Sequence, residues 1–372
     1  MSGLFNVGKQ AYLTVKRRSM PAQITQPALT QTMRVHTMAV TAVAFFKDSR
    51  RIVTSSADKT LRIWDVEKRA FVGGPFEGHS DFVLSVSVSP DERRIASGGG
   101  DGAIIIWDVE SKKMLFNKPR VKHTSRVSSV CFSPNGKRIA SGSWDSTVII
   151  WDAETGAVLS TLKCSSSVDC VAFSPDGLKL ACGTWRNIRV WSTDNAELLL
   201  EIDAHEEFVL SVVWSPDGQQ LISASADKTI KFWDSSNGAQ IGQPCTSYIR
   251  SLANSSDGSF IATASGDKTV HLWSTKSYQQ IGQALEHTAL VFCVAISPSG
   301  ELLASGDKYG SLQLWSIENT LCAALGTDSS YLAHRSKVKL DQKLYAEALS
   351  DAEKVRTISV VVLTFVIMFV GC

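Results

Sequence analysis

Histidine, serine or threonine, and aspartate recur at regular places along this chain of 372 residues. Such residue types can build a hydrolytic triad or a metal site. A catalytic group has to converge on one place, whereas these residues return many times, so we expect them to be structural. The positions are His36, His79, His123, His205 and His287, then Thr54, Ser97, Ser141, Ser223, Thr263 and Ser305, then Asp58, Asp101, Asp145, Asp227 and Asp267.

Motifs for other chemistry are missing from the sequence. It has no G-x-x-x-x-G-K-[ST], no G-x-S-x-G and no H-E-x-x-H pattern, and none of its eight cysteines forms a C-x-x-C pair. The sequence therefore predicts no enzyme, no catalytic residue, no metal, no cofactor and no small-molecule substrate.

A tryptophan followed by Asp or Ser returns at intervals of 40 to 44 residues and sets the period of the chain. These tryptophans are Trp64, Trp107, Trp151, Trp191, Trp233, Trp273 and Trp315. Each unit opens with a short apolar or alternating run, reverses at a sequence such as Pro175-Asp176-Gly177, and continues into a second run. A second turn, such as Ala226-Asp227-Lys228-Thr229, leads to the strand that ends at the tryptophan. The pattern predicts four short antiparallel strands per unit.

Middle strands that are apolar on both faces need a neighbouring unit on each side, and a closed ring supplies one. The repeat resembles that of the Trp-Asp (WD) repeat β-propeller family, in which a unit carries Gly-His near its start and Trp-Asp near its end. The resemblance implies an all-β fold, a seven-bladed β-propeller of four-stranded antiparallel blades, with a short helical C-terminal extension.

The same resemblance implies that His, Ser or Thr, Asp and Trp form a buried hydrogen-bonded network within a blade. The residues expected in it are His79, Ser97, Asp101, Trp107, His123, Ser141, Asp145, Trp151, His205, Ser223, Asp227 and Trp233. Unit four departs from the pattern, with Cys164 for His, Ala181 for Ser and Trp185 for Asp; unit six has Cys245 for His, and unit seven Tyr309 for Asp. A half-satisfied network is costly. We therefore expect blade four to be the least cross-braced.

Propellers of this family usually bind partners on the face that carries the loops before the innermost strands and the tight Asp turns. Aligned positions there are rich in aromatic residues, Leu and Arg, which are the types enriched at binding hot spots or at the cores of interfaces. The expected partner-binding residues are Phe82, Leu84, Arg126, Trp144, Phe208, Leu210, Tyr248, Arg250 and Phe292. The two arginines would select an acidic or polar group. The alternative is that single aromatics pack between blades.

The formal net charge of +2 argues against a nucleic-acid partner. The sequence thus predicts a non-enzymatic scaffold or adaptor that binds other proteins or peptides. Its unpaired thiols and the lack of a secretory signal favour the cytoplasm.

The predicted organisation is a basic flexible tail at 1–26, the propeller at 27–317, a linker at 318–330, a helical segment at 331–356 and an apolar tail at 357–372. An organelle-targeting peptide is the alternative for the N-terminus. Residues 27–33 are expected to close the ring by pairing with the seventh blade. The segment Tyr345–Lys354 is similar to the second helix of a tetratricopeptide unit.

The apolar run Ile358–Val370 leaves three interpretations open. It could be a membrane anchor, although it is short for a span, a segment packed on another surface, or a non-native extension. The alternative function that follows is a membrane-tethered regulatory propeller.

Overall fold

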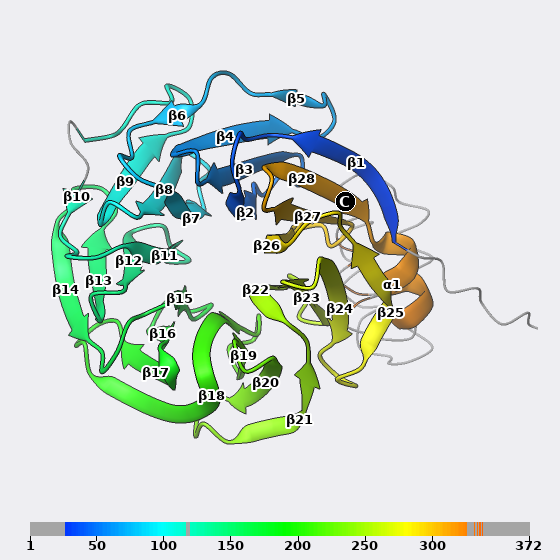
Figure 1. Ribbon diagram of the computed structural model, residues 1–372. Helices are drawn as coiled ribbons and strands as arrows, with labels where there is room; N and C mark the ends of the chain where they lie inside the picture. Colours follow the sequence, from blue (N-terminus) through cyan, green and yellow to red (C-terminus); the bar gives the residue numbers. More distant parts are fainter. Residues whose placement is uncertain are drawn as a thin grey trace, which may run out of the picture.

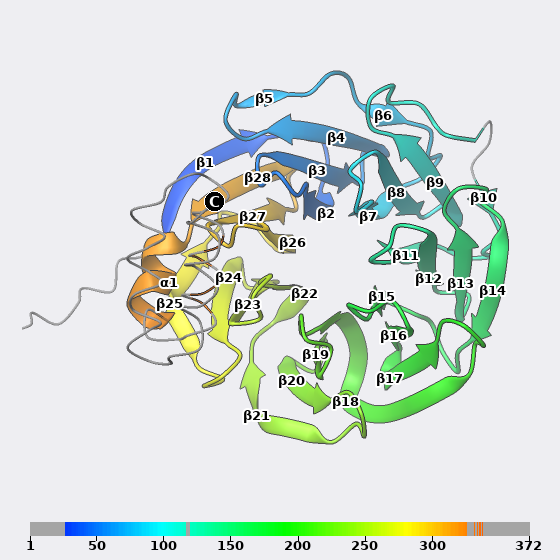
Figure 2. The same ribbon diagram turned by 180° about the vertical axis from the view of Figure 1, so that it is seen from behind.

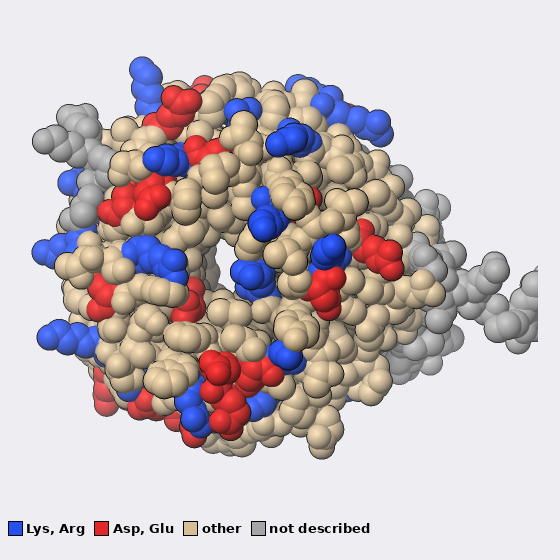
Figure 3. Space-filling view, in the orientation of Figure 1, with Lys and Arg blue, Asp and Glu red and all other residues tan. Residues whose placement is uncertain are grey.

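Antiparallel strands form a ring around a central opening in the computed structural model (Figure 1; Figure 3). The structure describes residues 27–116 and 120–325, together with positions 331, 333, 335 and 337. Within these residues the strand pairings divide into seven four-stranded units, or blades. The all-β propeller fold predicted from the sequence is therefore confirmed.

Each blade has an innermost strand beside the opening, two middle strands and an outer strand (Figure 1; Figure 2). The innermost strands are β2 (Val40–Phe45), β7 (Val83–Val88), β11 (Val127–Phe132), β15 (Cys170–Phe173), the second half of β18 (Leu198–Trp214), β22 (Ile249–Asn254) and β26 (Val291–Ile296). The second strands are β3 (Arg51–Ser56), β8 (Arg94–Gly99), β12 (Arg138–Ser143), β16 (Lys179–Gly183), β19 (Gln220–Ser225), β23 (Phe260–Ser265) and β27 (Leu302–Asp307).

The third strands end at or just after the repeating tryptophans. They are β4 (Thr60–Asp65), β9 (Ala103–Asp108), β13 (Thr147–Asp152), β17 (Trp185–Ser192), β20 (Thr229–Asp234), β24 (Thr269–Ser274) and β28 (Ser311–Ser316). The outer strands are β5 (Ala70–Phe71) with β6 (Phe76–Glu77), β10 (Arg120–Val121), β14 (Val158–Lys163), the first half of β18, β21 (Gln240–Thr246), β25 (Gln280–Glu286) and β1 (Ala28–Arg34). Blades are numbered here from β2–β6 as the first to β26–β28 with β1 as the seventh.

The hydrophobic core lies between neighbouring blades. The second strands are buried along almost their whole length, on both faces. Between blades three and four, for example, Val148 and Ile150 pack against Val168, Val171 and Phe173. Burial of one such aliphatic side chain stabilises the fold by about 1.5–3 kcal/mol, so each blade depends on its neighbours.

The ring closes because β1 pairs antiparallel with β28, the third strand of the seventh blade. Met33 of β1 joins the core cluster of Leu312, Leu314 and Ile52, which belong to the seventh and first blades. The pairing predicted for residues 27–33 is confirmed.

Helix α1 (Glu318–Leu325) follows the last strand, in the segment expected to be a linker. Leu321 and Leu325 pack in the same core cluster as Leu285 of β25, so the helix covers the outer side of the sixth blade (Figure 1). The segments 1–26 and 357–372, and nearly all of 331–356, lie outside the described residues. Among the helices that the structure describes, none is long and apolar enough to cross a membrane.

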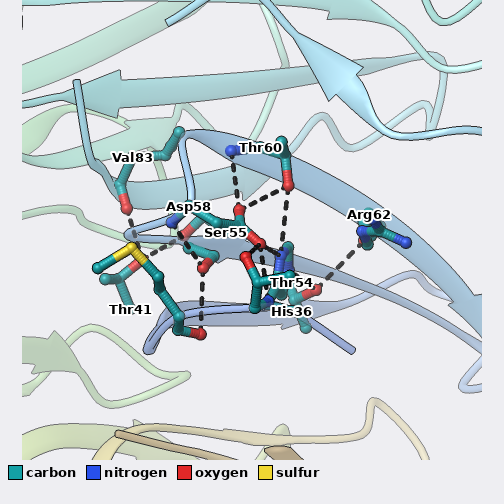
Figure 4. A network of polar contacts seen from close by, with 11 residues as sticks. His36, Thr41, Thr54, Ser55, Asp58, Thr60, Arg62 and Val83 are labelled. Atoms are coloured by element: carbon teal, nitrogen blue, oxygen red, sulfur yellow. Dashed lines mark hydrogen bonds and ion pairs between the residues drawn. The ribbon is translucent and has the colours of Figure 1, made fainter. Parts of the chain in front are cut away.

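The first blade shows the network of polar side chains (Figure 4). His36 Nε2 lies 2.8 Å from Thr54 Oγ1, and His36 Nδ1 lies 2.9 Å from Asp58 Oδ2. Thr60 donates its hydroxyl proton to Asp58 Oδ1 at 2.7 Å. These bonds connect the loop before the innermost strand, the second strand and the turn before the third strand.

Blades two, three and five add the tryptophan to the network. In blade three, the indole N–H of Trp151 donates to Ser141 Oγ at 2.8 Å. Ser141 Oγ lies 2.8 Å from His123 Nε2, and His123 Nδ1 lies 2.9 Å from Asp145 Oδ2. Burial lowers the pKa of His123, against the opposing effect of Asp145. A neutral imidazole with the proton on Nδ1 satisfies every member, because Nε2 then accepts the serine hydroxyl proton. The matching sets are His79, Ser97, Asp101 and Trp107, and His205, Ser223, Asp227 and Trp233.

Blade four differs from the sequence alignment by one residue. Cys182, and not Ala181, occupies the serine position, since it pairs with Arg189 as Ser223 pairs with Lys231 in blade five. The turn after Cys182 is one residue shorter than in the other blades, and a shift of one residue exchanges the two faces of a strand. Cys164 Sγ lies 3.8 Å from Cys182 Sγ, and Trp191 Nε1 makes no hydrogen bond of ordinary geometry within the described residues.

Blades six and seven keep part of the network. Trp273 donates to Thr263 at 3.0 Å, while Cys245 at the histidine position faces the carbonyl oxygen of Tyr278. In blade seven His287 Nε2 contacts Ser305 Oγ at 2.9 Å, but its Nδ1 has no partner among the described residues.

The difference between blades predicts unequal effects of truncation. Ser141→Ala leaves the buried Trp151 N–H and His123 Nε2 without their partner, so we expect a loss of about 3 kcal/mol in the free energy of unfolding. Cys182→Ala removes no such bond and should cost about 1 kcal/mol, mainly through lost packing. Urea unfolding of both variants measures the difference, and equal losses would contradict a weaker network in blade four.

His287 predicts a pH dependence of stability. Burial lowers its pKa to about 4, whereas the unfolded chain binds the proton near pH 6.5. The unfolded state therefore takes up a proton first as the pH falls, and the contribution of His287 to stability is lost from about pH 6.5 downward. Between pH 7 and pH 5 the loss is about 2 kcal/mol. His287→Gln should remove this part of the pH dependence in urea unfolding, and an unchanged dependence would count against it.

Candidate partner-binding face

The loops before the innermost strands and the turns before the third strands lie side by side. In six blades a backbone N–H of the turn donates to a carbonyl oxygen of the loop, at 2.8–3.1 Å. These pairs are Ala57 with Ala39, Gly100 with Phe82, Trp144 with Arg126, Ala226 with Phe208, Gly266 with Tyr248, and Lys308 with Leu290. The two sets of positions that the sequence assigned to one face are thus brought together, and we call this rim of the ring the loop face.

A fixed group of three side chains joins blades three and four on the loop face. The guanidinium of Arg126 lies over the ring of Trp144, 3.2 Å from its centroid. The indole N–H of Trp144 donates to Asp169 Oδ1 at 3.0 Å. Trp144 nevertheless keeps 43% of its surface exposed. Its orientation is therefore set while a large part of the ring remains available for contact.

The carboxyl group of Asp169 is largely buried, and its pKa is raised. Burial raises its pKa, against the lowering effects of the Trp144 hydrogen bond and the Arg126 charge. Its Oδ2 atom is buried and has no hydrogen-bond partner within the described residues. A carboxylate in this state is poorly compensated. Asp169 is not among the residues that the sequence predicted for this face.

Trp185 is an exposed aromatic residue that the sequence did not predict for this face. It stacks on Phe208 across blades four and five, with ring centroids 6.2 Å apart and an angle of 26° between the planes, and it is 54% exposed. The alignment placed Trp185 at the structural aspartate position. The signal that could have corrected this is the nine-residue interval from Cys182 to Trp191, one shorter than the ten found from serine or threonine to tryptophan elsewhere.

The remaining predicted residues are distributed over the other blades. The Lys228 ammonium lies 4.2 Å from the ring centroid of Tyr248, which is exposed, and Arg250 covers the half-buried Phe292 at 4.7 Å. Phe82 is exposed in blade two, whereas Leu84 and Leu210 are half-buried. The five predicted aromatic residues therefore differ in exposure. Phe82, Trp144 and Tyr248 are exposed to solvent, and Phe208 and Phe292 are partly covered.

Charged side chains of both signs are scattered over the ring in the space-filling view, and no large patch of one sign is visible on that side (Figure 3). No group of three or more His, Cys, Asp or Glu side chains in the described part of the chain could hold a metal ion.

The fold and the repeated network define a β-propeller, and the comparisons with known proteins give its family. Residues 27–65, 239–274 and 279–316 match the family model of the WD domain, G-beta repeat. Residues 83–247 match the model of the echinoderm microtubule-associated protein second beta-propeller. The chain therefore belongs to the WD-repeat β-propeller proteins. Such propellers generally mediate protein–protein interactions and are typically non-enzymatic scaffolds.

Two curated proteins are similar to short parts of the chain. Elongator complex protein 2 of Arabidopsis thaliana is 38% identical over 55 residues, and Protein HIR1 of Mycosarcoma maydis is 48% identical over 48 residues. The matches cover 14% and 13% of this chain, and 7% and 5% of those proteins. These comparisons do not confirm the tetratricopeptide resemblance of the C-terminal segment, which stays a prediction.

The buried carboxylate of Asp169 predicts a stabilising substitution. Asp169→Asn keeps an oxygen that accepts the Trp144 N–H but carries no charge. Because the folded-state pKa of Asp169 is raised, the wild type loses stability as the pH rises through the ordinary carboxyl range near pH 4. The variant should therefore be more stable at pH 7 and lose this advantage below pH 4. Thermal unfolding at both pH values measures this, and a less stable variant at pH 7 would show that Arg126 compensates the charge.

Proposed function

We propose that this protein is a non-enzymatic scaffold or adaptor that binds a segment of another protein on the loop face. The observation that carries the proposal is the group of Arg126, Trp144 and Asp169, in which an exposed tryptophan is held in one orientation by neighbours on both sides. A contact surface that is already ordered loses little side-chain entropy on binding.

Aromatic residues along the rest of the loop face support the same function. Phe82, Tyr248 and Trp185 are each at least 43% exposed, and they come from blades two, six and four. Tryptophan, tyrosine and arginine dominate the binding energy of protein interfaces. A partner that lies across the opening of the ring could contact several blades at once.

The arginines and lysines beside these rings indicate the polar part of the partner. The cationic groups of Arg126, Arg250 and Lys228 each lie over an aromatic ring. An acidic or polar group of the partner would complement them. Elongator complex protein 2 is by its name part of a complex, which agrees with a scaffold role for this protein. We place the protein in the cytoplasm, as its sequence favours.

Affinity capture followed by a binding measurement tests the proposal. The variant Phe82→Ala, Trp144→Ala, Phe208→Ala truncates three aromatics of the loop face. A partner captured by the wild type should bind this variant at least about tenfold more weakly than the wild type, as measured by calorimetry with purified proteins. Circular dichroism and thermal unfolding establish that the variant remains folded.

A matched control truncates three exposed leucines elsewhere. Leu159 and Leu199 lie on outer strands, and Leu178 follows the turn residues Pro175-Asp176-Gly177. Each leucine is at least as exposed as Phe82 and Trp144. Changing all three to alanine should leave affinity unchanged. If the leucine variant loses the partner and the aromatic variant keeps it, binding lies on the blade sides and the loop face is not the site.

A further inference from the structure

Two cysteines occupy the histidine and serine positions of blade four. Cys164 directly follows the outer strand β14, and Cys182 lies in β16. Their sulfur atoms are 3.8 Å apart. The same two positions hold His123 and Ser141 in blade three, with a contact of 2.8 Å. Blade four thus replaces the histidine–serine hydrogen bond by a longer and weaker contact between two thiols.

The two thiols differ in exposure and in pKa. Cys164 is half-buried, whereas Cys182 is fully buried. A hydrogen bond from the Cys182 thiol lowers the pKa of Cys164, and the nearby Arg189 guanidinium adds to this effect against the opposing effect of burial. The pKa of Cys182 is raised well above its usual range by the same hydrogen bond and by burial. Arg189 is held in place by two bonds from its guanidinium to Glu201 Oε1, at 2.9 and 2.8 Å.

We infer that Cys164 and Cys182 form a reversible redox pair, in which a peroxide oxidises Cys164 and Cys182 then closes a disulfide bond within blade four. The inference goes beyond the proposed function and does not depend on where a partner binds. In blade four, unlike blade six, cysteines hold both the histidine and the serine positions, so the two thiols face each other.

The chemistry balances with hydrogen peroxide as the oxidant. The Cys164 thiolate attacks one peroxide oxygen, the O–O bond breaks, and Cys164 becomes a sulfenic acid while hydroxide leaves. Cys182 sulfur then attacks the Cys164 sulfur, the S–O bond breaks, and the released hydroxide takes the Cys182 proton to form water. Peroxide is reduced by two electrons, and the two thiols are oxidised to one disulfide. Two equivalents of an external thiol reverse the reaction.

The geometry requires a modest movement. The sulfur atoms have to approach from 3.8 Å to the bonding distance of about 2.05 Å. The short turn that follows Cys182 carries Trp185, so closure of the bond would act on the strand that leads to the loop face. A disulfide that strains its surroundings is reduced more easily, which suits a transient bond in a reducing compartment.

Cys245 provides an internal control in the same protein. It occupies the histidine position of blade six, but Thr263 stands where blade four has Cys182. Burial raises the pKa of Cys245 to about 11, so its thiol is protonated near neutral pH. Peroxide should therefore consume the free thiol of Cys164 at least about tenfold faster than that of Cys245.

Peptide mapping of the full chain tests the inference. Trypsin cleaves after Lys163, Lys179 and Arg186, which places Cys164 and Cys170 on one peptide and Cys182 on the next. The experiment therefore uses a Cys170→Ser chain, in which a link between the two peptides has a single assignment. After treatment with hydrogen peroxide and blocking of free thiols, mass spectrometry should find the linked peptides, and dithiothreitol should remove the link.

Two variants separate the steps. In Cys182→Ser the reaction should stop at the Cys164 sulfenic acid, which dimedone traps. In Cys164→His with Cys182→Ser, which installs the pair found in blade three, the response should disappear while circular dichroism shows an intact fold. The inference is overturned if Cys164 and Cys182 stay reduced at a peroxide dose that oxidises Cys245, or if Cys164 is oxidised without any link to Cys182.

Discussion

The contact between neighbouring blades is the interaction on which the rest of this structure depends. Each blade exposes two apolar faces, and side chains such as Val148, Ile150 and Phe173 are buried only because the next blade covers them. A row of blades would leave two faces in water at its ends. The pairing of β1 with β28 removes these ends by joining the first described strand to the last blade. Burial of apolar surface thus sets the ring, and the ring sets where every loop lies.

Polar networks fix the details that hydrophobic contacts leave open. In blade three the chain from Trp151 through Ser141 and His123 to Asp145 connects the third strand to the turn that bears Trp144. A buried network of this kind is stable only when each member has its partner. In the blades that keep the network, the same side chains that could have formed a catalytic triad therefore hold a turn in place, at the rim where a partner would bind.

Blade four is where the repeat departs most from its pattern, and several distinctive features gather there. Its short turn presents Trp185 against Phe208, Asp169 at its innermost strand accepts the Trp144 hydrogen bond, and Cys164 faces Cys182. Losing the histidine removed the constraint on its partners, since no buried imidazole needs a hydroxyl or a carboxylate. The freed positions could then take residues with other chemistry, and the proposed binding face and the proposed redox pair both use them.

The sequence by itself determined the period, the four strands of each unit, the ring closure by residues 27–33 and most of the network, because each follows from local patterns that are repeated many times. Tertiary structure decided what depended on distance between blades. The contact of Arg126 with Trp144 and Asp169 joins two units that the alignment treats separately, and the stack of Trp185 on Phe208 does the same. The alignment of blade four failed for a related reason. A turn shorter by one residue exchanges the two faces of a strand, and only the pairing of Cys182 with Arg189 shows which residue faces Cys164. Repetition makes a fold readable from the chain, whereas contacts that occur once have to be found in three dimensions.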